Sequence, residues 1–294
     1  MSYCFRRLKA GSWARFNRAS RPEDHDGVTN GLKMKNLMNL ALGSISLIGL
    51  FAVAPGAYAQ DAAAAAPSAP DWTLAGYLQA QSDYRFRGLT QSARNPVPQA
   101  TLNLTGPDGF YVGTWVSQIN WQLNGINENP SIEWDIYGGK HFDLGGTDLN
   151  VEAYEYAYPD ANVGKGGPAA SFFEGIFTLS HAFGPLALDA VYAISPQFSG
   201  GNGTGNYIEG QAILTLTDWL TVSTNIGHQW VEKAPTDYTH ADVGFTATWK
   251  QFVLDARYVG TTLNKVNCGF YMGTKNACSG GPTVTLTYNF ALQP

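Results

Sequence analysis

The residues of this 294-residue chain best suited to chemistry are charged side chains at alternate positions. Asp83, Arg85 and Arg87 form one such row, and Glu133 and Asp135 repeat its spacing. Because successive side chains of a β-strand point to opposite faces, a spacing of two places these charges on one face. Arginines opposite carboxylates create a transverse electric field, and a guanidinium offers a bidentate site for the carboxylate or phosphate of a solute.

The charged rows extend over most of the chain, and we expect them to line a lumen while the opposite, apolar rows face lipid. These rows contain twelve charged residues, of which nine are acidic. An acidic lining favours cations over anions in a narrow polar channel. A second interpretation is that the arginines and carboxylates pair with one another and plug the lumen. The expected lining residues are Asp83, Arg85, Arg87, Glu133, Asp135, Glu152, Glu174, Asp189, Glu209, Asp242, Asp255 and Arg257.

Catalysis has little support in the pattern of residues. The four histidines after residue 60 lie on separate segments, and His181 points to the opposite face from its neighbour Ser180. His240 and Asp242 share a face, but two groups are too few for a metal site. We therefore expect no enzyme, no catalytic residue, no cofactor and no metal.

Two of the three cysteines, Cys268 and Cys278, lie ten residues apart in the connection before the last segment. The third, Cys4, precedes a predicted cleavage site. An even pair in one exported loop predicts a disulfide, because the periplasm is oxidising. Closing a loop of this length stabilises its ordered form by about 2–3 kcal/mol.

The elements that must position these residues are segments in which apolar and polar residues alternate. Most of them reach the ~9–11 residues that a tilted strand needs to cross a bilayer, whereas soluble strands usually have ~5–6. In two of them, 110–121 and 149–158, the positions of the aromatic residues leave the inward row open. The twelve segments are 72–87, 97–105, 110–121, 131–141, 149–158, 172–182, 186–194, 206–217, 220–231, 238–249, 251–262 and 283–290.

The connections between these segments alternate between short and long, as they do in membrane barrels. Aromatic residues gather near both ends of the segments, which is typical of the two girdles at membrane interfaces. By the short turns are Trp72, Phe142, Phe183, Trp219, Trp249 and Phe252. By the long loops are Tyr84, Phe86, Trp121, Tyr158, Tyr192, Trp230 and Tyr258.

The fold predicted by these features is all-β: an antiparallel, up-and-down transmembrane β-barrel of about 12 strands over residues 72–290. Hydrocarbon offers no hydrogen bonds, so an open strand edge there costs several kcal/mol per group, and closure pairs every edge. The alternative is a soluble sandwich, in which the same aromatic residues form a core between two sheets.

The N-terminal part of the chain contains a signal peptide. Lys35 precedes an apolar run over residues 40–53, and Ala57-Tyr58-Ala59 is a cleavage site of the A-x-A type. We expect residues 34–59 to be the signal peptide, with 1–33 a mis-annotated upstream extension. Residues 60–71 are rich in alanine and proline, which predicts a flexible periplasmic lead-in.

The charge balance excludes a nucleic-acid binder. Of 18 basic and 23 acidic residues, 8 and 3 lie in residues 1–59, which leaves a mature chain with 10 basic and 20 acidic residues and a net charge of −10. No basic surplus is available to neutralise phosphates. Only 14% of residues are charged while 44% are hydrophobic, so a disordered chain is also excluded.

The last segment predicts an interaction with the machinery that assembles the barrel. Val284, Leu286, Tyr288 and Phe290 alternate with polar residues, and an apolar strand with an aromatic end resembles the signal read by the barrel-assembly machinery. Residues 291–294 follow as a C-terminal tail. We also expect contact with outer-membrane lipid and lipopolysaccharide. The oligomeric state stays open, because a subunit interface has the same composition as a lipid-facing surface.

Several motifs resemble one known family. They are the run Ser-Asp-Tyr-Arg-Phe-Arg-Gly-Leu-Thr-Gln-Ser at 82–92 with Pro96 after it, Gly-Phe-Tyr-Val-Gly-Thr-Trp at 109–115, Glu-Trp-Asp-Ile-Tyr-Gly-Gly-Lys at 133–140 and Tyr-Ala-Tyr-Pro-Asp-Ala at 156–161. Together they resemble the TorF-type porins, a proteobacterial outer-membrane family otherwise described as of unknown function. The resemblance is specific over residues 77–160, and it implies an outer-membrane barrel that acts as a porin.

The expected function is therefore passive diffusion of small hydrophilic solutes across the bacterial outer membrane. An acidic lumen with cation preference and a constriction at Arg85 and Arg87 complete this expectation. Two alternatives stay open: a non-conducting structural or adhesive barrel whose external loops bind a partner, and an outer-membrane enzyme, which the separated histidines disfavour.

Overall fold

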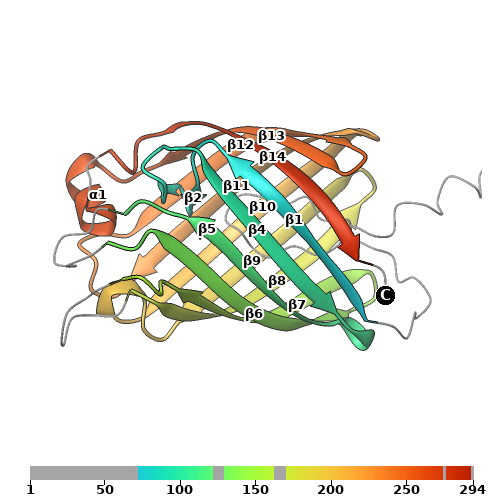
Figure 1. Ribbon diagram of the computed structural model, residues 1–294, viewed down its shortest axis with the longest axis horizontal. Helices are drawn as coiled ribbons and strands as arrows, with labels where there is room; N and C mark the ends of the chain where they lie inside the picture. The colour runs from blue at the N-terminus through green and yellow to red at the C-terminus, as the bar shows by residue number, and fades with distance from the viewer. Residues whose placement is uncertain (1–71, 122–128, 162–169, 274–275, 293–294) are drawn as a thin grey trace, which may run out of the picture. The chain divides into compact units, whose positions relative to one another are not determined.

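The computed structural model describes residues 72–121, 129–161, 170–273 and 276–292. Within this part, twelve antiparallel strands form one closed barrel (Figure 1). Each strand pairs with its neighbour along the chain, and β1 closes the ring by pairing with β14. The prediction of an up-and-down barrel of about 12 strands is thus confirmed.

The barrel strands match the alternating segments of the sequence to within a few residues, apart from the first. They are β1 (Thr73–Gln81), β4 (Val97–Thr105), β5 (Phe110–Gln118), β6 (Ile132–Asp143), β7 (Thr147–Ala157), β8 (Phe172–Phe183), β9 (Leu186–Ser195), β10 (Gly205–Thr217), β11 (Leu220–Val231), β12 (Tyr238–Trp249), β13 (Phe252–Thr261) and β14 (Gly281–Leu292). The remaining elements are the two-residue strands β2 (Arg85–Phe86) and β3 (Leu89–Thr90), the 3₁₀ turns η1 (Pro107–Gly109) and η2 (Ser199–Gly201), and the helix α1 (Lys265–Met272).

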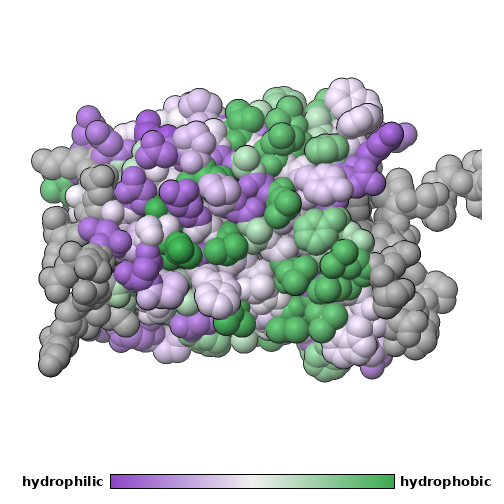
Figure 2. Space-filling view, in the orientation of Figure 1, coloured by the Kyte–Doolittle hydropathy of each residue, from purple (hydrophilic) through white to green (hydrophobic). Residues whose placement is uncertain are grey.

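The outward row of the strands is apolar and exposed. Ile226 in β11 is 61% exposed and Phe245 in β12 is 55% exposed, although both lie in the middle of long strands. On the face drawn in Figure 2, hydrophobic side chains gather in the half of the barrel nearer the short turns, and polar ones gather nearer α1. A surface of this kind is unfavourable in water and suits a hydrocarbon solvent.

The aromatic residues by the short turns all point outward, as the girdle prediction requires. Trp72, Phe142, Phe183, Trp219, Trp249 and Phe252 are each at least 40% exposed. By the long loops, Tyr192, Trp230 and Tyr258 are exposed as well. The prediction is wrong for Tyr84, Trp121 and Tyr158, which are buried, and for Phe86, which packs edge-on against Tyr156.

The first predicted strand is too long in the sequence analysis. It ends at Gln81, and the chain then turns back as a hairpin that contains β2 and β3. We call residues 82–96 the inner hairpin. Its turn uses two consecutive residues with positive φ, Arg87 at +46° and Gly88 at +85°. A Cβ on Gly88 would lie 2.6 Å from the Cβ of His240, so the turn passes closest to β12 where the chain has no side chain.

The chain end also differs from the expectation. Ala291 and Leu292, which the sequence assigns to a tail, continue β14 and pair with Ala75 and Leu74 of β1. These pairs extend the seam that closes the barrel. The upstream extension 1–33, the signal peptide 34–59 and the lead-in 60–71 lie outside the described residues, as do residues 293–294. In the part of the chain that is described, no helix has both the length and the hydropathy needed to span a membrane.

The connection between β13 and β14 contains α1 and the predicted disulfide. Cys268 and Cys278 are bonded, and both are buried. The helix begins after Asn264, whose side-chain oxygen accepts hydrogen bonds from the backbone N–H groups of Val266 and Asn267. It ends at Gly273 in the left-handed conformation, as helices commonly do. We call the described residues 263–273 and 276–280 the disulfide loop.

Candidate functional site: the barrel interior

The charged residues singled out in the sequence lie on the inner side of the barrel wall or in the inner hairpin. Eleven of the twelve are buried, and Asp189 is half-buried. The structure also decides the two ambiguous segments: Trp115 and Ser117 of β5 face inward, as do Glu152, Tyr154 and Tyr156 of β7. The interior thus collects nine carboxylates and three guanidinium groups from strands far apart in sequence.

Arg87 extends from the tip of the inner hairpin to the opposite wall. Its guanidinium donates two hydrogen bonds to the carboxylate of Glu174 in β8, at 2.9 and 2.7 Å, and a third to Oε1 of Gln229 in β11, at 2.6 Å. The same group lies 3.9 Å from the ring centroid of Tyr207 in β10. Contacts to three strands fix the hairpin tip across the barrel interior.

Arg85 holds the base of the inner hairpin. It donates to Asp83 two residues earlier and to the carbonyl oxygens of Gly88 and Ser279. Asp83 also accepts a short hydrogen bond from the hydroxyl of Thr90. Asp83 and Arg85, the first two charged residues of the motif at 82–92, therefore form an ion pair within the hairpin and neutralise each other.

A second ionic cluster lies on β12 and β13. The Nε and Nη2 atoms of Arg257 donate to Asp255 at 2.7 and 2.8 Å, and Nη1 donates to Asp242 at 2.5 Å. Asn225 in β11 donates to the Asp242 carboxylate, and Thr246 donates to Asp255. All three interior arginines are thus paired with carboxylates, which is the arrangement that the plugged interpretation requires.

The opposite side of the interior combines tyrosines with carboxylates that have no arginine partner among the described residues. The hydroxyl of Tyr154 donates to Asp135 at 2.9 Å, and that of Tyr158 donates to Glu133 at 3.1 Å. Tyr154 also stacks on Tyr137, with 5.1 Å between the ring centroids. Phenol groups are neutral donors, so they bring no positive charge to these carboxylates.

The sequence analysis missed several interior residues because they are neutral or aromatic. Gln229 completes the Arg87 site, and Tyr207 hydrogen-bonds both Glu209 and His240 at 2.5 and 2.7 Å. Tyr154 and Tyr156 stand at alternate positions of β7, on the row of Glu152. That shared row was the available signal, because every aromatic residue of β7 stands on the row of Glu152.

Asp160 is a further polar anchor, at the end of the barrel that carries the long loops. Its carboxylate accepts hydrogen bonds from the N–H and hydroxyl of Ser131, at 2.9 and 2.5 Å, and from the N–H of Ile132, at 3.4 Å. Burial acts to raise the pKa of Asp160, but these donors outweigh it and hold the pKa below its ordinary value. The contact joins the end of β7 to the start of β6.

The space left between the inner hairpin and the wall is small. A cavity of about 40 Å³ lies at the hairpin tip and is lined in part by Arg87, Gly88, Tyr207 and His240. This volume holds a few water molecules, and an organic solute does not fit. No group of three or more metal-ligating side chains occurs in the described part of the chain. The inner hairpin crosses the barrel interior beside the 40 Å³ cavity.

Comparisons with known proteins identify one family. The model of the family described as "Bacterial protein of unknown function (Gcw_chp)" matches residues 64–290. No curated protein matches the sequence. Among solved structures, the chain is similar to the KdgM porin in complex with disordered oligogalacturonate, at 9% identity and a TM-score of 0.48 over 74% of this chain and 99% of that one.

Two further solved structures are similar at the same level. The NanC porin has 9% identity and a TM-score of 0.46, over 75% of this chain and 99% of that one. An outer-membrane channel from Pseudomonas putida F1 has 10% identity and a TM-score of 0.43, over 76% of this chain and 97% of that one.

Proposed function

The chain belongs to the Gcw_chp family of bacterial proteins of unknown function, and from that premise we propose that it is an outer-membrane channel for small hydrophilic solutes. The observation that carries the proposal is the division of the barrel wall. Its outward row is apolar and exposed, while its inward row and the inner hairpin together hold the nine predicted carboxylates and three arginines. A closed barrel with such rows suits a bilayer outside and water inside. The finer resemblance to TorF-type porins is part of this proposal.

The proposed lumen prefers cations. Arg85, Arg87 and Arg257 are paired with Asp83, Glu174, Asp242 and Asp255. The other five interior carboxylates, Glu133, Asp135, Glu152, Asp189 and Glu209, have no arginine partner in the described part of the chain. Rings of unbalanced carboxylates raise the local concentration of cations and repel anions.

The proposed constriction is the inner hairpin, with Arg85 and Arg87 at its base and tip. It crosses the interior beside Gly88, where a cavity of about 40 Å³ lies. With the hairpin in this position, passage is limited to water and small ions, so larger solutes require the hairpin to move. Outer-membrane lipid, lipopolysaccharide and the barrel-assembly machinery are the partners that this function implies, the last through β14.

Single-channel recording in planar bilayers tests the proposal. We expect discrete conductance steps from the refolded protein, with a reversal potential of cation-selective sign in a salt gradient. Bilayers treated with the same detergent without protein are the control. Absence of steps in every salt would contradict the channel.

A non-conducting barrel is the second candidate, and two observations favour it. Every interior arginine is paired with a carboxylate, and the cavity at the hairpin tip is small. In that case the barrel is structural or adhesive, and its external loops bind a partner. An outer-membrane enzyme is not part of the proposal, and we expect refolded protein to release no fatty acid from phospholipid vesicles.

A further inference from the structure

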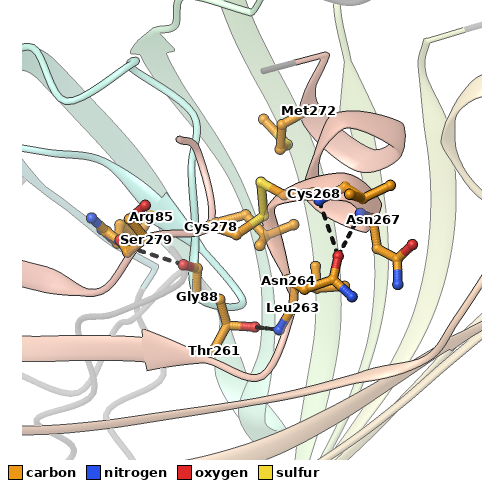
Figure 3. The surroundings of a disulfide bond; sticks show 12 residues. Arg85, Gly88, Thr261, Leu263, Asn264, Asn267, Cys268, Met272, Cys278 and Ser279 are labelled. Atoms are coloured by element: carbon orange, nitrogen blue, oxygen red, sulfur yellow. Dashed lines mark hydrogen bonds between the residues drawn. A yellow bond between two sulfur atoms is a disulfide. The ribbon is translucent and has the colours of Figure 1, made fainter. Parts of the chain in front are cut away.

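The inner hairpin is held by two separate parts of the protein. The strand wall contacts its tip through Arg87, and through Phe86, which packs edge-on against Tyr156 of β7. The disulfide loop contacts its base and its returning arm (Figure 3). The hairpin precedes this loop by about 180 positions in the sequence. The contact between them is therefore made by the fold and not by proximity along the chain.

Four hydrogen bonds join the disulfide loop to the inner hairpin. The backbone N–H of Thr90 donates to the carbonyl oxygen of Ala277 at 3.0 Å. Arg85 and Arg94 both donate to the carbonyl oxygen of Ser279, at 3.0 and 2.5 Å. The side-chain amide of Gln91 lies 3.9 Å from the sulfur of Met272. The two oxygen acceptors, which accept three of these bonds, belong to residues 277 and 279, which flank Cys278.

The disulfide fixes where these acceptors lie. Cys278 is bonded to Cys268 in α1, so residues 277 and 279 are held against the helix. The helix itself is anchored, because the hydroxyl of Tyr271 donates to the carbonyl oxygen of Thr236 in the β11–β12 connection, at 2.8 Å. Leu89 of the hairpin belongs to the same buried apolar cluster as both cysteines. A continuous series of contacts thus connects the β11–β12 connection, α1, the disulfide and the hairpin.

We propose that the disulfide loop is a latch that keeps the inner hairpin inside the barrel, and that cleavage of the Cys268–Cys278 bond frees the hairpin and widens the passage. The expected change in conductance rests on the proposed channel function. The hold of the loop on the hairpin does not rest on that function. With the bond cleaved, Cys278 is no longer held against Cys268, and the acceptors of Thr90, Arg85 and Arg94 at residues 277 and 279 lose this constraint.

Reduction of the folded protein is the direct test. A dithiol such as dithiothreitol gives two electrons and two protons to the disulfide, which becomes two thiols, while the dithiol becomes a cyclic disulfide. Added on the side of the long loops, it should raise single-channel conductance at least about twofold, because the hairpin crosses the lumen. The Cys268→Ser, Cys278→Ser variant should show the higher conductance from the start and no response to the dithiol.

Hydrogen exchange provides a readout that does not depend on conduction. The amides of Thr90 and Gln91 are protected by bonds to Ala277 and Tyr84. After reduction, or in the double serine variant, peptides that cover the hairpin should exchange faster, while peptides from β10 and β11 should not change. An intact barrel migrates faster in gels before heating than after it, so this mobility shift checks that the barrel is intact.

A third variant separates failure of the latch from failure of the channel. Replacement of residues 83–91 by a short glycine–serine linker removes the hairpin and leaves the disulfide loop. If this variant conducts more than the wild type while reduction changes neither conductance nor hairpin exchange, the latch is wrong and the channel stands. If no variant conducts but reduction accelerates hairpin exchange, the latch stands and the channel is wrong.

Discussion

Arg87 and Glu174 form a buried, bidentate ion pair that joins the inner hairpin to the barrel wall, with N–O distances of 2.9 and 2.7 Å. The two residues are 87 positions apart, and their side chains are almost fully buried. Each charge is compensated chiefly by the other, with further contacts from Gln229, Tyr156 and Tyr207. Loss of one partner therefore leaves a buried charge without its counter-charge.

The first prediction concerns the stability of this pair. Glu174→Gln should lower the free energy of unfolding by about 3–5 kcal/mol, because the guanidinium of Arg87 stays buried without its counter-charge. The double variant Arg87→Met, Glu174→Leu should lose less, because both charges are removed together. Unfolding in urea, followed by tryptophan fluorescence in detergent micelles, measures both. A double variant less stable than the single one would show that the pair stabilises the barrel in its own right.

The second prediction concerns the constriction. The double variant Arg85→Ala, Arg87→Ala removes the side chains at the base and the tip of the inner hairpin, so single-channel conductance should rise. Lys233→Ala, which removes one exposed positive charge near a long loop, is the matched control and should leave conductance unchanged. If the arginine variant conducts like the control, these residues line no narrow point.

The course of the inner hairpin shows where the sequence is insufficient. Alternation is a local property, so it predicts the twelve strands and the inward row of Glu133, Asp135, Glu174 and Arg257. Between Ser82 and Arg87 the alternation continues, yet the chain leaves the wall. Here the conformation is decided by partners far along the chain, such as Gln229, 142 positions from Arg87. Local pattern contains no information about such partners.

The aromatic residues show the same limit. The prediction is correct for Trp249, because Trp249 ends the outward row of β12, which contains Val243, Phe245 and Ala247. Tyr84 and Tyr158 lie beyond the last paired residue, so parity no longer decides which way they face. Their burial follows from interior contacts, with Trp115 in one case and with Trp121 and Glu133 in the other.

The third prediction concerns ion selectivity. Glu133→Gln together with Asp135→Asn removes two interior charges that have no arginine partner, so the reversal potential in a salt gradient should shift toward zero. The shift should be smaller at high ionic strength, where counter-ions screen the remaining carboxylates. Asp108→Asn is the control, because Asp108 lies in the turn η1, and asparagine tolerates its positive φ. An equal shift in the control would assign selectivity to the surface.

The fourth prediction concerns pH. Because hydrogen bonds from Ser131 and Ile132 lower the pKa of Asp160 in the folded protein, the ionised form is favoured there. The contact is fully present above the ordinary pKa of an aspartate and is lost as the pH falls through the lower, folded value. The amide resonance of Ser131 should therefore titrate with a midpoint below about 3.9. Asp160→Asn should remove this titration, and a midpoint above the ordinary value would contradict the role of these donors.

The fifth prediction tests which solvent meets each face of the wall. Ile226 and Gln211 lie on neighbouring strands, near mid-strand, but Ile226 is 61% exposed on the outside while Gln211 is buried inside. If the outer face meets hydrocarbon, Ile226→Arg should cost about 2–4 kcal/mol of folding free energy in lipid vesicles, since arginine is unfavourable near the bilayer midplane. Gln211→Arg should cost less, because the lumen is polar and acidic. In a protein whose outer face meets water, the order is reversed: an exposed arginine is nearly neutral and the buried one is costly. Folding titrations in vesicles measure which of the two variants loses more folding free energy. A larger loss for Gln211→Arg would contradict both the membrane assignment and the channel.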